Sequence, residues 1–209
     1  MQGLFYNCSK LQFLNIDNFD TKNTQNMKEL FYNCKELSYL NLNNFDTYNV
    51  TDMFYMFYGC INLSYINIER FITTDVTNME FMFSNCISLV TLNLNNFITN
   101  KVKSVKNMFS GCTSLLFVNI SNFNLSNVTN IQNMFYNCQS LISLNTSNFG
   151  KTNAQQMQSM YIINIFRFIQ FLFTKCFKYI KHVQKLSNIR RIKFFIIYHN
   201  KSFRYVKYV

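Results

Sequence analysis

The chain has 209 residues, of which 49% are hydrophobic, and it carries a formal net charge of +11. Both of its histidines, His182 and His199, follow residue 161, so the first 161 residues cannot form a Ser-His or Cys-His catalytic pair or a histidine-rich metal centre. With four glycines in total, the chain also has no glycine-rich phosphate loop. The composition argues against the common catalytic classes, and we expect a protein that is not an enzyme.

A repeat of 26 residues runs through most of the chain. One cysteine marks each copy, and Leu, Asn and Phe follow that cysteine after three, seven and eleven positions. The six cysteines are Cys8, Cys34, Cys60, Cys86, Cys112 and Cys138. A unit of this size cannot bury enough apolar surface to fold alone, so the period predicts a stack of similar units.

The first half of each unit predicts a short strand. In the copy that starts at Cys34, the apolar Leu40 and Leu42 flank the polar Asn41. This alternation is typical of a strand with one buried face. Equivalent strands of successive copies should lie parallel and side by side.

The second half of the unit predicts a short helix of about two turns. Val50, Met53, Met56 and Phe57 have the spacing of one apolar helix stripe, and Asn49 stands where an N-cap is expected. The residue before each later cysteine is always Asn or Gly, the two types that most readily take the left-handed conformation that ends a helix. These stop positions are Asn33, Gly59, Asn85, Gly111 and Asn137.

The consensus M-F-x-N/G-C-x-x-L-x-x-L-N-L-x-N-F-x-T-x-N-V-T-N-M resembles the BspA-like leucine-rich repeat family, with Phe where the usual leucine-rich repeat has Asn. The resemblance covers residues 1–161. It implies an α/β leucine-rich-repeat solenoid with one short parallel strand and one short helix per repeat. It also implies a location at the cell surface or outside the cell and a role in adhesion, and it brings no catalytic residues.

Charge divides the chain into two expected parts. Residues 1–161 form about six repeats, the first one partial, and contain as many acidic as basic residues. Residues 162–209 hold eleven of the twenty Lys and Arg residues and no acidic residue. This tail is expected to be disordered or helical, or to be an artefact of the gene model.

The tail could also contact a membrane surface through its basic and aromatic residues. Its longest apolar run, Ile162–Phe173, carries Arg167 and is shorter than the roughly 20 residues that cross a bilayer. We expect no nucleic-acid binding, because no recognition motif accompanies the charge.

The start of the chain lies inside a repeat, because Met1 aligns with Met27, and no signal peptide precedes it. We therefore expect a fragment of a longer array, whose uncapped ends favour end-to-end self-association. The ladder cysteines are expected to be small buried thiols, since no C-x-x-C pair or Cys/His cluster indicates a metal site. No metal and no cofactor are expected.

The exposed side of the strands is the candidate ligand-binding surface. If the leucines point inward, an aromatic-rich column and an asparagine column point outward, and both suit a protein or glycan ligand. The candidate residues are Phe13, Asn15, Tyr39, Asn41, Tyr65, Asn67, Asn93, Phe117, Asn119 and Asn145. The asparagine column could instead be purely structural, each amide bonding the next, and the whole array could be a spacer without a ligand.

Overall fold

The computed structural model describes residues 1–142, 144, 194–199 and 202–207. The chain divides into two compact units, Met1–Ile165 and Phe166–Val209, and each is taken by itself below.

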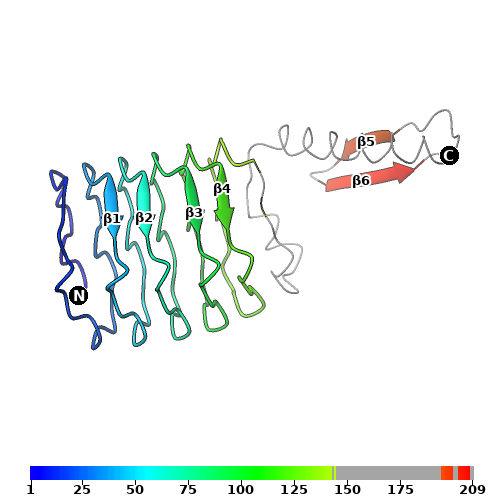
Figure 1. The fold of residues 1–209 in the computed structure, drawn as a ribbon. Helices are drawn as coiled ribbons and strands as arrows, with labels where there is room; N and C mark the ends of the chain where they lie inside the picture. The colour runs from blue at the N-terminus through cyan, green and yellow to red at the C-terminus, as the bar shows by residue number, and fades with distance from the viewer. Residues whose placement is uncertain (143, 145–193, 200–201, 208–209) are drawn as a thin grey trace, which may run out of the picture. The chain divides into compact units, whose positions relative to one another are not determined.

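Four strands of three residues recur at the repeat period in the first unit (Figure 1). They are β1 (Tyr39–Asn41), β2 (Tyr65–Asn67), β3 (Thr91–Asn93) and β4 (Phe117–Asn119). The strands β1 and β2 pair in parallel, as do β3 and β4, and in both pairs equivalent residues of adjacent repeats are partners. The predicted alternation is confirmed, because in β1, β3 and β4 a buried central residue lies between two exposed ones.

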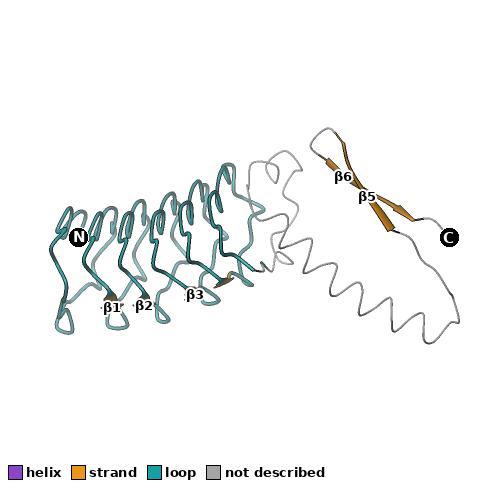
Figure 2. Cartoon of the chain, turned by 90° about the horizontal axis from the view of Figure 1, so that it is seen from above, coloured by secondary structure: helices purple, strands orange, loops and turns teal. Residues whose placement is uncertain are grey.

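A second set of parallel bridges joins the repeats away from the strands. It links the equivalent residues Asn26, Asp52, Asn78, Ser104 and Asn130 in succession. Figure 2 shows the coils of this unit following one another side by side. Equivalent residues of neighbouring repeats therefore lie next to each other on two sides of each coil.

The prediction of a short helix in each repeat is wrong, because the described residues contain no helix. In the segment from Met53 to Gly59, every second backbone N–H donates to the next repeat instead of to its own turn. Tyr55 N–H donates to Glu80 C=O at 3.0 Å, and Phe57 N–H donates to Met82 C=O at 2.9 Å. An α-helix needs those donors for its own carbonyls, so bonding between repeats takes its place.

The N–H groups between these donors bond to the carbonyl three residues earlier and close tight turns, as Tyr58 N–H does to Tyr55 C=O. Such successive turns require residues in the left-handed conformation. Asn33, Gly59 and the other three Asn or Gly positions before the cysteines have φ between +55° and +77°, as predicted. A second left-handed residue stands four positions earlier in each repeat, for example Tyr55 with φ 55°. Two left-handed residues per segment rule out a right-handed helix there. With no helix to cap, the Asn49 side chain instead donates to Lys22 C=O of the preceding repeat at 2.8 Å.

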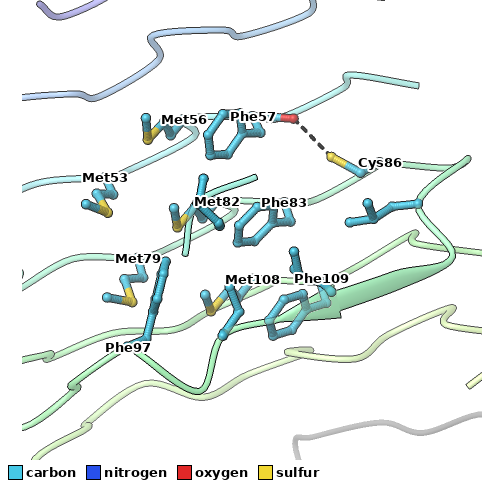
Figure 3. Close-up of a cluster of buried hydrophobic side chains, with 14 of the residues drawn as sticks. Met53, Met56, Phe57, Met79, Met82, Phe83, Cys86, Phe97, Met108 and Phe109 are labelled. Atoms are coloured by element: carbon cyan, nitrogen blue, oxygen red, sulfur yellow. Dashed lines mark hydrogen bonds between the residues drawn. The ribbon is translucent and has the colours of Figure 1, made fainter. Parts of the chain in front are cut away.

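The core consists of apolar columns that run along the stack (Figure 3). The phenylalanines Phe31, Phe57, Phe83 and Phe109 stack nearly parallel, with ring centroids 5.3 to 5.8 Å apart. The expected helix stripe is buried, although the backbone is not helical: Val50, Met53, Met56 and Phe57 are all 0% exposed.

In the second unit, β5 (Phe194–His199) and β6 (Ser202–Lys207) form an antiparallel hairpin in which Phe194 pairs with Lys207. The rest of the tail, including the apolar run Ile162–Phe173, lies outside the described residues, so the expectations for it remain predictions. Among the residues described, no helix has the length and hydropathy to cross a membrane.

Candidate functional site

The strand face of the first unit exposes aromatic rings. Tyr39 and Tyr65 are 56% and 50% exposed and stack with centroids 5.0 Å apart and planes 7° from parallel. Phe117 on β4 is 48% exposed, and Thr91 occupies the same column between Tyr65 and Phe117. Phe13, one repeat before β1, is 82% exposed but lies outside any strand. About half or more of each of these side chains is exposed, and none belongs to the hydrophobic core.

The asparagine column ends each strand with a local turn. Each side-chain oxygen accepts a hydrogen bond from the backbone N–H two residues later, as Asn41 does from Asn43 at 3.2 Å. The same bond, at 3.0 to 3.3 Å, is made by Asn15, Asn67, Asn93 and Asn119. The asparagine column therefore has a structural role, but not the one considered from the sequence: each side chain stabilises a local turn instead of bonding to the next asparagine. Asn145 lies outside the described residues.

The strand face carries no charge on β1 to β4, whose twelve residues are aromatic, aliphatic, Thr or Asn. The nearest acidic side chains in this part of the repeat are Asp17 and Glu69, which follow the asparagine column by two positions. A highly charged ligand would find few partners on such a surface.

The strand ladder is interrupted between β2 and β3. In the first pair, Tyr65 N–H donates to Ser38 C=O at 3.3 Å and Leu42 N–H donates to Asn67 C=O at 2.9 Å. The equivalent donors one repeat later are those of Thr91 and Ile68, and neither makes a hydrogen bond within the described residues. The bonds resume between β3 and β4, so β2 and β3 belong to separate two-stranded sheets.

A second aromatic cluster, which was not predicted from the sequence, lies in the segment expected to be helical. Tyr6, Tyr32 and Tyr58 form a stacked column with centroids 4.7 and 4.9 Å apart. Beside it, Tyr55 stacks on Phe81 at 4.6 Å. Tyr55 and Phe81 both have positive φ, which bulky residues rarely adopt, and nothing in the sequence marks them as left-handed positions.

The cysteine ladder is buried as predicted, except that Cys8 in the first repeat is partly exposed. Each buried thiol donates to the carbonyl oxygen of the phenylalanine 29 residues earlier, as Cys60 does to Phe31 at 3.1 Å. Burial raises the pKa of the Cys34 thiol to about 12, so these groups are protonated and poor nucleophiles at neutral pH.

Acidic residues in the turns are solvated rather than clustered. Asp20 accepts from Lys22 N–H at 3.2 Å, and its pKa lies below the ordinary value mainly because of that hydrogen bond. Within the described part of the chain, no group of three or more His, Cys, Asp or Glu side chains is placed to hold a metal ion.

The comparisons with known proteins identify the family but no activity. A family model described as "Mycoplasma protein of unknown function, DUF285" matches residues 1–117 and again residues 65–171. The chain belongs to this family. No curated protein and no solved structure is significantly similar to it. Evidence on function therefore has to come from the surface that the repeats build.

Proposed function

We propose that this DUF285 protein is a non-enzymatic binding module of the BspA-like leucine-rich-repeat type, a solenoid that holds a protein or glycan ligand on its strand face. Its role would be adhesion at the cell surface, without a cofactor. The observation that supports the proposal is the stacked, half-exposed pair Tyr39 and Tyr65, joined by the exposed Phe117. Aromatic rings beside amide groups are typical of recognition surfaces.

The alternative of a purely structural array predicts a different outcome from substitutions. If the strand face binds, Tyr39→Ala, Tyr65→Ala and Phe117→Ala abolish ligand capture and each lower the free energy of unfolding by about 1–2 kcal/mol, because about half of each ring is exposed. If the array is only a spacer, none of these changes affects any partner.

Two matched controls separate binding from folding. Ile98→Ala removes an exposed side chain that lies away from the strands and should leave capture intact. Phe83→Ala removes a fully buried ring and should cost about 3–5 kcal/mol. A loss of stability in Tyr39→Ala as large as in Phe83→Ala would mean that the strand-face rings are core, and the proposal would fail.

Association with a membrane surface through the tail is the second candidate, because residues 162–209 carry eleven basic and no acidic residues. It predicts that the full chain floats with vesicles containing anionic lipid and is released by salt, since screening shortens the reach of surface charge. A variant with all eleven tail lysines and arginines replaced by glutamine should not float. Flotation that survives this change would exclude the tail as the cause.

A further inference from the structure

The column of rings on the strand face has one vacancy, and the interrupted ladder lies beside it. Tyr39 and Tyr65 stack directly, whereas Thr91 separates Tyr65 from Phe117. Two spacings of hydrogen-bonded strands amount to about 9–10 Å, and the missing ladder bonds between β2 and β3 make this a lower bound for the distance between Tyr65 and Phe117. An interval of that size admits one further ring between the two.

Backbone groups without partners line the same interval. Thr91 N–H and Ile68 N–H are the donors that the interruption leaves unbonded within the described residues, and Ser64 C=O and Asn93 C=O are the matching acceptors. We call this interruption between β2 and β3 the seam. It is more open to solvent than the paired strands, because Ile66 is partly exposed whereas its equivalents Leu40, Leu92 and Val118 are buried. Polar backbone groups at such a place bond to water or to a ligand.

The number and type of these groups restrict the ligand. Ile68 is only 2% exposed, so the groups open to a ligand are Thr91 N–H, Ser64 C=O and Asn93 C=O. One donor and two acceptors suit hydroxyl groups, which both donate and accept, better than carboxylate or phosphate oxygens, which only accept, or ammonium groups, which only donate. The uncharged residues of β1 to β4 likewise favour an uncharged ligand. A sugar ring has the required shape, with apolar faces to stack between aromatic rings and hydroxyl groups at its edge.

We infer that the strand face has a subsite over Thr91 that takes one neutral sugar ring of a glycan between Tyr65 and Phe117. This inference rests on the proposed binding function and narrows its ligand to an uncharged glycan. The backbone groups of the seam and the side chains of Asn67 and Asn93 are the hydrogen-bonding partners for its hydroxyl groups.

The test places an aromatic side chain at position 91, where it would occupy the proposed sugar site. Thr91→Tyr completes the column with a ring that stacks between Tyr65 and Phe117, and it should fold because Tyr is favoured in strands. The labelled full chain is tested on an array of neutral hexose and N-acetylhexosamine oligosaccharides. We expect binding by the native chain and at least about tenfold weaker binding by Thr91→Tyr.

Two further variants keep the test decisive. Ile98→Tyr adds the same ring at an exposed position off the strands and should bind as the native chain does. Thr91→Gln blocks the interval without a ring, and it replaces Thr91→Tyr if that variant has a lowered melting temperature. Binding by both Thr91 variants at native strength would overturn the subsite.

A second arm uses a displayed library of unglycosylated peptides, so that the subsite and the proposed function can fail separately. If no neutral oligosaccharide binds but peptides are captured in a way that needs Tyr39 and Tyr65, the sugar subsite is overturned and the binding function stands. If neither arm gives binding that depends on those tyrosines, both are overturned.

Discussion

The thiol of Cys86 donates a hydrogen bond to the carbonyl oxygen of Phe57, 29 residues earlier, at 3.2 Å (Figure 3). The N–H of Cys60 donates to the same oxygen at 3.3 Å. One carbonyl oxygen thus serves two adjacent repeats, and this contact recurs at each buried cysteine.

This bond predicts how Cys86 responds to substitution. Cys86→Ser keeps a donor for Phe57 C=O, whereas Cys86→Ala removes it. We expect the serine variant to be more stable than the alanine variant by about 1 kcal/mol, the net contribution of one buried hydrogen bond. Urea unfolding followed by circular dichroism measures the difference. An alanine variant as stable as the serine variant would show that the thiol is only a space filler.

Burial of Cys138 predicts a loss of stability in alkali. Desolvation raises the pKa of this thiol from 9.0 to about 12. The unfolded chain therefore releases this proton above about pH 9, whereas the folded chain retains it to about pH 12. The free energy of unfolding should fall between these values, by up to about 1.4 kcal/mol per pH unit for this group.

Cys138→Ser is the control for the alkaline effect, because it removes this titration and leaves all other groups in place. Unfolding in urea at pH 8 and at pH 10.5 should show a smaller decrease for the variant than for the native chain. Equal decreases would contradict the raised pKa.

A buried threonine predicts the strength of another contact between repeats. The Thr73 hydroxyl donates to Ile98 C=O at 3.0 Å and accepts from Ile98 N–H at 2.8 Å. Thr73→Val keeps the shape but leaves both groups unpaired, so we expect a loss of about 1–3 kcal/mol. Thr73→Ser retains the hydroxyl and should lose less than Thr73→Val. The reverse order of stabilities would show that the methyl group matters more than the two bonds.

The left-handed position Gly59 predicts a clash that a second change relieves. Its φ is +70°, and an added Cβ would collide with the side-chain oxygen of Asn33. Gly59→Ala should therefore destabilise the chain by more than the roughly 1 kcal/mol that the conformation alone costs. Adding Asn33→Gly removes the colliding atom.

A double-mutant cycle on these two positions separates clash from backbone strain. We expect the Gly59→Ala and Asn33→Gly changes to be non-additive, with the double variant more stable than the sum of the single effects predicts. Additive effects would place the entire cost in the backbone of Gly59.

The sequence was sufficient to predict which side chains of the repeat are buried. An apolar residue that recurs at the same position in every repeat is expected to be buried, whether its backbone is helical or not. The stripe from Val50 to Phe57 is buried, as expected, yet it is not helical. Its spacing is shared by a helix and by a coil that alternates bonds to the next repeat with tight turns. The two backbone conformations differ in the acceptor of each N–H group. In this protein the acceptors lie in the next repeat, so the sequence of one repeat does not distinguish them.

The local signals were reliable where one residue type has one dominant conformational use. Asn33 and Gly59 were expected to be left-handed, and they are. Tyr55 and Phe81 could not be predicted in this way, because aromatic residues rarely adopt positive φ and stacking with neighbours in other repeats holds them there. The asparagines of the strand face were expected either to bond one another or to face a ligand, and their turn-forming bonds were missed.

Because most contacts between neighbouring units of the described array recur at the repeat period, the array can gain or lose length only in steps of one whole unit. Removing 26 consecutive residues inside the array would bring equivalent positions together, with most hydrogen bonds re-formed by counterparts. Removing any other number would shift every later residue out of line with its acceptor. Gene rearrangements between copies could therefore create arrays of varied reach, and such variants would also change how many strands separate one aromatic ring from the next.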